Sequence, residues 1–94
     1  MGDFKQCTNA KGGAFYYEED GKQMGEMVYV MAGTSKMIIE HTEVDEALKG
    51  KGIGKQLLGK LVEFVREEKL KVMPLCPFAK ATFEKTKDWQ DVLF

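Results

Sequence analysis

The stretch that decides the fold is Lys49-Gly50-Lys51-Gly52-Ile53-Gly54-Lys55, which lies directly before an amphipathic segment. Glycine lets the backbone turn tightly and lets a ligand approach closely. A helix that follows such a turn presents unpaired N–H groups and the positive end of its dipole. The stretch therefore predicts either a phosphate-binding loop or a purely structural turn.

Two familiar nucleotide loops can be tested against this stretch. A Walker loop needs Ser or Thr after Gly-Lys to reach magnesium, whereas Gln56 follows Gly54-Lys55 here. A dinucleotide-binding fingerprint needs a third glycine where Lys55 stands. Both nucleotide loops are therefore excluded.

The residues after the loop predict a helix, a strand and a second helix. Apolar side chains recur at helical spacing from Ile53 to about Glu68. Residues 71–75 form a short apolar run typical of a buried strand, and Pro77 suits the first position of a helix over about residues 77–85. The tail from Lys87 onward is too short to assign.

The residues before the loop predict antiparallel strands. Residues 14–19 and 23–31 are rich in aromatic and β-branched side chains, and they flank Asp20-Gly21, a strong hairpin signal. Residues 1–12 are polar, so we expect a loose start before the first strand. The chain should thus begin as a β-meander.

A third strand is expected over residues 36–44, where side chains alternate between two faces. The alternation places Met37, Ile39 and His41 on one face, and Ile38, Glu40 and Thr42 on the other. Because a right-handed crossover joins this strand to residues 71–75, the two should run parallel. The predicted fold class is α/β with a mixed sheet: an antiparallel meander, a parallel strand-helix-strand unit and a C-terminal helix.

Length and composition indicate one globular domain over residues 1–94, with its core at about residues 13–86. The chain has 44% hydrophobic and 31% charged residues, which excludes disordered and collagen-like classes. It lacks the run of roughly 20 apolar residues needed to cross a bilayer. It also begins without a secretory signal, so we expect a cytoplasmic protein. Cys7 and Cys76 are expected to be free thiols, and no metal site is expected.

Charge divides the chain into two unequal halves. Residues 1–48 carry four lysines against nine acidic residues, and residues 49–94 carry ten basic against six acidic residues. Lys49, Lys51, Lys55 and Lys60 have no acidic residue among them, so they predict either a site for an anion or a solvated lysine face. The near-neutral total and the lack of interleaved aromatic residues disfavour nucleic acid as a partner.

The pattern from Lys49 through Gly52 to Gly54, between a strand and a long helix, resembles the core motif of the GNAT superfamily of acetyl-CoA-dependent N-acetyltransferases. That motif is Gln/Arg-x-x-Gly-x-Gly/Ala, and lysine at the first position keeps the charge. The resemblance implies that the loop (Lys49, Gly50, Lys51, Gly52, Ile53, Gly54 and Lys55) holds the pyrophosphate of CoA. It also implies that the backbone near Val44 pairs with the pantetheine amides.

A second motif of this superfamily, Asn-x-x-Ala-x-x-Leu-Tyr, is similar in spacing to residues 76–83, with Ala79 in register. Cys76 stands in place of the Asn, and Phe83 in place of the Tyr that usually protonates the departing CoA thiolate. The chain thus looks like a minimal GNAT-type family with a Cys-Pro-Phe motif. The resemblance implies cofactor contacts from Pro77, Phe78 and Phe83.

Cys76, His41 and Glu43 are the candidate catalytic residues. Cys76 precedes the second helix, whose N-terminus would stabilise a thiolate, although a small buried hydrophobe is the usual fate of cysteine. His41 is the single histidine and, by itself, is more often structural. If the strands that carry them are neighbours, His41 and Cys76 should approach each other where the thioester would point.

Two routes for acetyl transfer remain open at this stage. In direct transfer, His41 or Glu43 takes a proton from an attacking amine, and the Cys76 thiol takes the role of the missing tyrosine. In the covalent route, a Cys76 thiolate assisted by His41 first accepts the acetyl group.

Three functions are compatible with the sequence. The first is a small acetyltransferase that uses acetyl-CoA and an unidentified amine acceptor, as a monomer or weak homodimer. The second is a module that binds CoA or acetyl-CoA without robust catalysis. The third is an α/β interaction domain whose glycine loop binds nothing.

Overall fold

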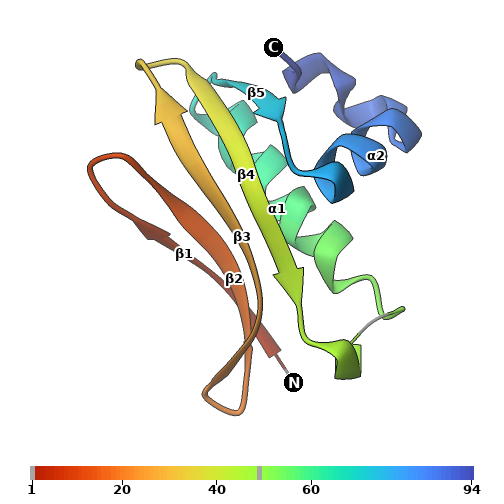
Figure 1. Ribbon diagram of the computed structural model, residues 1–94. Helices are drawn as coiled ribbons and strands as arrows, with labels where there is room; N and C mark the ends of the chain where they lie inside the picture. Colours follow the sequence, from red (N-terminus) through yellow and green to blue (C-terminus); the bar gives the residue numbers. More distant parts are fainter. Residues whose placement is uncertain (1, 49) are drawn as a thin grey trace.

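A mixed five-stranded sheet with helices on one face makes up the computed structural model, which describes residues 2–48 and 50–94 (Figure 1). The strands lie in sequence order: β1 (Gly2–Thr8), β2 (Gly12–Glu19), β3 (Lys22–Ala32), β4 (Lys36–Val44) and β5 (Lys71–Pro74). The helices are α1 (Ile53–Glu67), α2 (Pro77–Lys85) and two short 3-10 helices, Glu46–Leu48 and Lys87–Val92. Only the β4–β5 pair is parallel among the described strands, so the predicted mixed sheet is confirmed.

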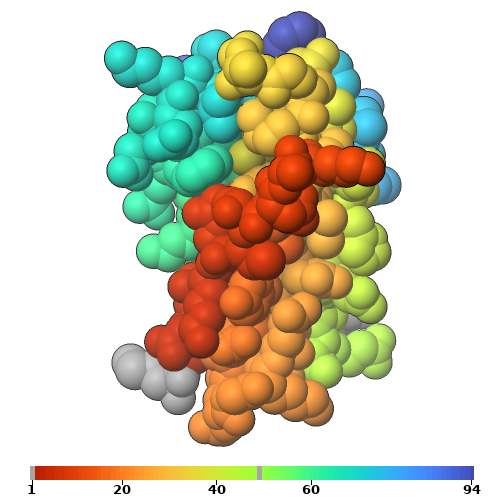
Figure 2. All heavy atoms as spheres, turned by 90° about the vertical axis from the view of Figure 1, so that its left-hand side faces the viewer, coloured from red at the N-terminus to blue at the C-terminus, as the bar shows by residue number. Residues whose placement is uncertain are grey.

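The expectation of a loose start is wrong, because the first residues form strand β1 at the edge of the sheet. Figure 2 shows β1, in red, crossing the front of the molecule beside α1 in teal. Phe4 packs its ring against Tyr17, and Lys5 pairs with Glu18 at 2.8 Å. Exposed charges are common on edge strands, where they discourage pairing with other chains, and this explains the polar sequence.

The hairpin between β2 and β3 is confirmed at Asp20-Gly21. Both residues have positive φ, 52° and 78°. Two-residue turns of this kind match the twist of the flanking strands, and Asp-Gly tolerates that backbone conformation well. The turn pairs Glu19 with Lys22, and a one-residue shift at Met24 then sets the register that pairs Phe15 with Met27 in the core.

A β-bulge at Glu40 interrupts the alternation of β4. His41 pairs with Val28, whereas Ile39 pairs with Tyr29, so Glu40 is an extra residue without a partner on β3. A bulge of this kind transfers the following side chains to the opposite faces. The expectation that His41 shares a face with Met37 and Ile39 is therefore wrong, and Thr42 turns toward the helices in its place.

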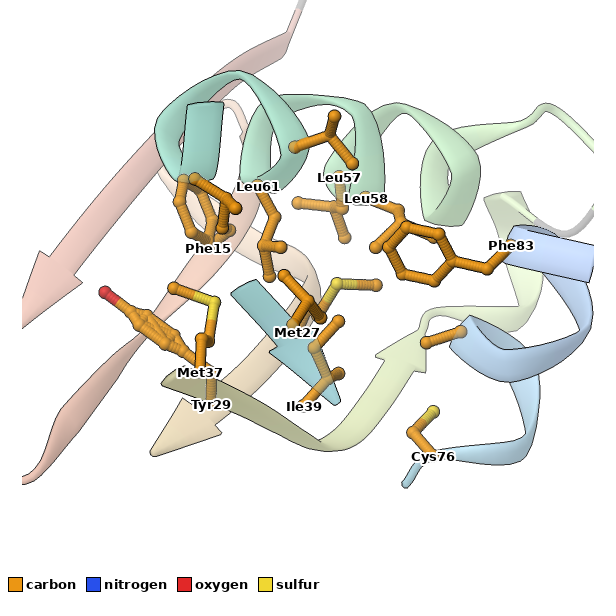
Figure 3. Close-up of a cluster of buried hydrophobic side chains, with 14 of the residues drawn as sticks. Phe15, Met27, Tyr29, Met37, Ile39, Leu57, Leu58, Leu61, Cys76 and Phe83 are labelled. Atoms are coloured by element: carbon orange, nitrogen blue, oxygen red, sulfur yellow. The ribbon is translucent and has the colours of Figure 1, made fainter. Parts of the chain in front are cut away.

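The core lies between the sheet and α1, whose apolar stripe is fully buried (Figure 3). Leu57, Leu58 and Leu61 of this helix are completely excluded from solvent and pack over β2, β3 and β4. The stripe follows the helical period that the sequence predicts, so α1 and α2 are both confirmed. No described helix combines the length and the apolar character that a membrane span requires.

The C-terminal tail closes the β5 edge of the sheet. Leu93 bridges to Val72, and the backbone N–H of Phe94 donates to the carbonyl of Val72 at 2.9 Å. Val92 is buried. The packed cluster therefore extends past residue 86, and the same tail anchors to α1 through Arg66 and Asp91.

Candidate functional site

A cavity of about 540 Å³ lies between the end of β4, the start of α1 and α2. This volume falls in the range of ligand-binding pockets, roughly 300–1,000 Å³. Its walls consist of Thr42, Val44, Leu48, Gly50, Gly52, Ile53, Gly54, Lys55, Phe78, Thr82, Lys85 and Thr86. The end of β4 and the start of α1 meet at one end of the sheet (Figure 1).

One side of this cavity is a wedge where β4 and β5 separate. Their parallel pairing ends at Ile39 and Pro74, and the N–H groups of Leu75 and Cys76 then both donate to the Ile39 carbonyl, at 3.0 and 3.2 Å. Beyond this point β4 continues to Val44, whereas the segment that follows β5 turns into α2. The last residues of β4 thus present a strand edge to the cavity, and such an edge can pair with amides of a ligand.

The opposite side is the glycine loop with the first turn of α1. Gly50 and Gly52 have φ values of 82° and 76°, a region that favours glycine. Gly52 is the N-cap residue and supplies no side chain to cap the helix. The first intrahelical bond runs from the Gln56 N–H to the Gly52 carbonyl at 3.0 Å. The three preceding N–H groups are therefore available to an anion.

Two lysines add positive charge to this helix N-terminus. Lys51 and Lys55 are both exposed, and neither forms an ion pair with any residue in the described ranges. The combination of free N–H groups, helix dipole and unpaired lysines favours a phosphate-bearing ligand.

The ring of Phe78 on α2 packs directly on the backbone of Gly54 on α1. A Cβ atom at position 54 would lie 2.7 Å from Cζ of that ring, which is closer than carbon atoms approach. Glycine at this position therefore permits the contact between the two helices. The ring is 41% exposed, so it forms part of the cavity surface.

Cys76 is the N-cap residue of α2 and is buried, with 5% exposure. Figure 3 places it at the margin of the apolar cluster. Its Sγ donates a hydrogen bond to Oγ1 of Thr42 at 3.2 Å. Thr42 lines the cavity, but Cys76 does not.

His41 and Glu43 lie on the other face of β4 from this pair. His41 Nε2 is 3.3 Å from Glu43 Oε2, and the side chains are 57% and 71% exposed. Glu26 lies opposite Glu43 on β3, and the donor atoms of all three residues fall within 4.8 Å of one another. The expected approach of His41 to Cys76 is wrong, because the bulge at Glu40 brings Thr42 to the cysteine.

Comparison with known proteins identifies the family. A family model described as GCN5-related N-acetyl-transferase matches residues 14–92. The chain belongs to the GCN5-related N-acetyltransferase family. Over 50 residues it is also 38% identical to Protein NATD1 of Xenopus tropicalis, covering 53% of this chain and 46% of the relative. That match therefore spans about half of the relative's length.

Solved structures agree with this membership. A GCN5-like protein from Staphylococcus aureus, solved in solution by NMR, is 35% identical with a TM-score of 0.78 and covers 98% of this chain and 87% of its own. A GNAT family acetyltransferase from Elizabethkingia anophelis with acetyl-CoA bound has a TM-score of 0.66 at 14% identity. That match covers 78% of this chain and 63% of the other protein. The second likeness shows the GNAT fold alone.

The cavity between β4, α1 and α2 contains most of the residues that the sequence assigns to the cofactor. Those in its walls are Val44, Gly50, Gly52, Ile53, Gly54, Lys55 and Phe78. Three others are not: Lys51 lies on the loop outside the walls, Pro77 is exposed at the start of α2, and Phe83 is 1% exposed in the core. Lys49 lies outside the described residues.

Five residues in the walls of this cavity were not predicted from the sequence: Thr42, Leu48, Thr82, Lys85 and Thr86. Thr82 is four residues after Phe78 on the same helix, so helical spacing was a usable signal. Thr42 is two residues before Val44 and shares its face, which strand alternation predicts once the bulge is known. Leu48, Lys85 and Thr86 follow from loop and helix-end geometry that the sequence does not specify.

Proposed function

We propose that this protein binds acetyl-CoA in the cavity between β4, α1 and α2 and transfers the acetyl group to an amine. Membership of the GCN5-related N-acetyltransferase family supports the reaction class and the acyl donor. The observation that carries the proposal is the uncapped N-terminus of α1, with its free N–H groups beside a ligand-sized cavity. That feature suits the pyrophosphate of CoA.

In this proposal each part of the cofactor has a defined neighbour. The N–H groups of residues 53–55 hold the pyrophosphate, with Lys51 and Lys55 adding charge. The strand edge at Val44 pairs with the pantetheine amides, and the thioester lies in the wedge between β4 and β5. Phe78 covers the cofactor from α2.

The acceptor amine approaches the thioester from the open face of the sheet. There His41, with Glu43 at 3.3 Å, is placed to take the proton that the attacking nitrogen loses. Two routes follow from the same arrangement: direct attack on acetyl-CoA, or prior transfer to the Cys76 thiol. The acceptor is an amine of a small molecule or of a protein.

A binding module without robust catalysis is the second candidate. The tyrosine of the second GNAT motif is replaced by Phe83, which is buried. In addition, a short turn held by Asn9 joins β1 directly to β2. No helix of the described chain is therefore inserted between these strands to cover the open face of the sheet. Little of the molecule is thus available to select an acceptor.

Ligand titration tests the proposal. Thermal unfolding is measured with increasing acetyl-CoA, CoA and ATP; acetyl-CoA and CoA should raise the midpoint, by an amount that corresponds to about 2.7 kcal/mol at a hundredfold excess over Kd. ATP should stabilise less, because it lacks the pantetheine that pairs with β4. Absence of stabilisation by either CoA species would reject both candidates.

Turnover then separates the two candidates. Release of CoA from acetyl-CoA is followed with spermidine, lysine amide and a peptide with a free N-terminus as acceptors. An enzyme releases CoA in proportion to amine and enzyme, whereas a binding module gives no release above the uncatalysed rate with any of them.

A further inference from the structure

Thr42 is the side chain that separates Cys76 from the cavity. Thr42 is a residue of the cavity wall, and its hydroxyl accepts the hydrogen bond from Cys76 Sγ, at 3.2 Å. Cys76 itself is 5% exposed and is not part of the cavity wall. Thr42 therefore links the thiol to the wall of the cavity.

The hydroxyl of Thr42 has an unused donor. A hydroxyl group carries one O–H donor and two acceptor positions. One acceptor position is occupied by the Cys76 thiol, and within the described residues the O–H of Thr42 donates to no protein group. The hydrogen of Thr42 is thus free to be donated to a ligand in the cavity.

We propose that Thr42 and Cys76 form a proton relay to the sulfur of the departing CoA, an inference that rests on the proposed acetyl transfer. Thr42 is the catalytic donor, and Cys76 is the proton source behind it. The relay takes the place of the tyrosine that Phe83 replaces in the second motif. Transfer of the acetyl group is then direct, and no acetyl-cysteine forms.

The step balances as follows. The amine nitrogen bonds to the carbonyl carbon of the thioester, and the C–S bond breaks with its electron pair going to sulfur. The CoA sulfur takes the proton of the Thr42 hydroxyl, while Thr42 takes the proton of Cys76. The nitrogen loses its proton to His41, which releases it to solvent, and solvent returns one proton to Cys76.

Cys76 occupies the N-cap position of α2, and the first-turn N–H groups of Phe78 and Ala79 lie at the positive end of the helix dipole. The Cys76 side chain makes no capping hydrogen bond to them, and its sulfur is bonded to Thr42. Pro77 contributes no N–H to this end of the helix.

Four variants test the relay: Thr42→Val, Thr42→Ser, Cys76→Ala and the double variant Thr42→Val/Cys76→Ala. Acetyl transfer from acetyl-CoA is measured by CoA release with hydroxylamine as the acceptor, since this small nucleophile needs no acceptor pocket. Cys7→Ala is the matched control, because Cys7 is exposed on β1, away from the cavity. Kd for acetyl-CoA is measured for each variant.

We expect Thr42→Val to lower kcat about tenfold or more, as loss of a general acid does. Thr42→Ser should restore most of the rate, because it keeps the hydroxyl. The kcat of Cys76→Ala should fall as far as that of Thr42→Val, and the kcat of the double variant should fall no further, because the effects of groups that act as one unit are non-additive. Kd for acetyl-CoA should change less than twofold in every variant.

Other outcomes overturn the relay. An acetyl group on Cys76, detected by intact mass and formed as fast as turnover, supports the covalent route in its place. Equal rates for wild type and Thr42→Val, or multiplicative losses in the double variant, remove Thr42 from the path of the proton. A wild type that fails to bind acetyl-CoA rejects the proposed function itself, whereas binding with these rates unchanged rejects the relay alone.

Discussion

Glycine at position 54 is the residue on which the cavity geometry depends most closely. In a helix, alanine is ordinarily favoured over glycine by roughly 0.5–1 kcal/mol, so Gly54→Ala should leave the fold intact. The new Cβ would, however, displace the Phe78 ring, which it would meet at 2.7 Å. We expect affinity for acetyl-CoA to fall about tenfold, or about 1.4 kcal/mol, by isothermal titration calorimetry.

Gly59→Ala is the matched control for this substitution. Gly59 lies on the same helix, and its Cβ would meet Trp89 at an ordinary contact distance of 3.6 Å. Affinity for acetyl-CoA should be unchanged. Equal affinities in the two variants would contradict the role assigned to Gly54 and Phe78.

Phe83 provides a second test at the residue scale. Its ring is 1% exposed and packs edge-on against Trp89, so Phe83→Tyr should bury a hydroxyl without a partner. The expected cost is about 1–3 kcal/mol in the free energy of unfolding, measured with urea, with no gain in turnover. Phe78→Tyr, on an exposed ring, should cost far less. A faster Phe83→Tyr enzyme would show that this ring reaches the thioester.

At the scale of elements, the bulge in β4 decides which chemistry faces which side. Without Glu40 as an extra residue, His41 would point at the helices and Thr42 at solvent. With it, the potential proton acceptor faces the open side of the sheet, and Thr42 joins Cys76. In the proposed reaction, one inserted residue thus separates the group that takes a proton from the groups that supply one.

The C-terminal 3-10 helix is held to α1 by the Arg66–Asp91 pair, whose Nη2 and Oδ1 atoms are 2.7 Å apart. The hydrogen bonds from Arg66 hold the pKa of Asp91 below its usual range. The pair therefore stabilises the fold above the ordinary carboxyl range, and this contribution is lost as pH falls through the lowered pKa. Asp91→Asn should lower the thermal midpoint at neutral pH.

The Arg66–Asp91 pair also predicts how the thermal midpoints of the two proteins compare in acid. Below the lowered pKa, Asp91 is protonated in the wild type, so the midpoints of wild type and Asp91→Asn should converge. Thermal scans at a series of pH values measure the difference. A gap between the two proteins that is constant from neutral to strongly acidic pH would disprove the role of this carboxylate.

At the scale of the whole molecule, the sequence predicts the elements that have a clear period or turn signal. The α1 stripe, the Asp20-Gly21 turn and the parallel strand after α1 all follow from local patterns. β1 does not, because an edge strand needs few apolar residues and its polar composition resembles that of a loop. The tail is likewise ordered by contacts with β5 and α1 that are distant in sequence.

The site is predictable to a similar extent. Val44 and the glycine loop are identified by motif, and the structure places most of them in one cavity. The hydrogen-bond partner of Cys76 cannot be identified from a motif. A bulge is set by pairing between strands, and one unpaired residue moves the side chains that follow it to the opposite face of the sheet. Neither motif specifies the acceptor.

The central claim, that acetyl-CoA occupies the cavity between β4, α1 and α2, is tested most directly by NMR. Backbone amide shifts of the ¹⁵N-labelled protein are followed during titration with acetyl-CoA. We predict that the largest changes fall on residues 42–44, 50–55 and 78–86, with β1 and β2 nearly unchanged. Changes confined to the open face of the sheet, or none at saturating acetyl-CoA, would contradict it.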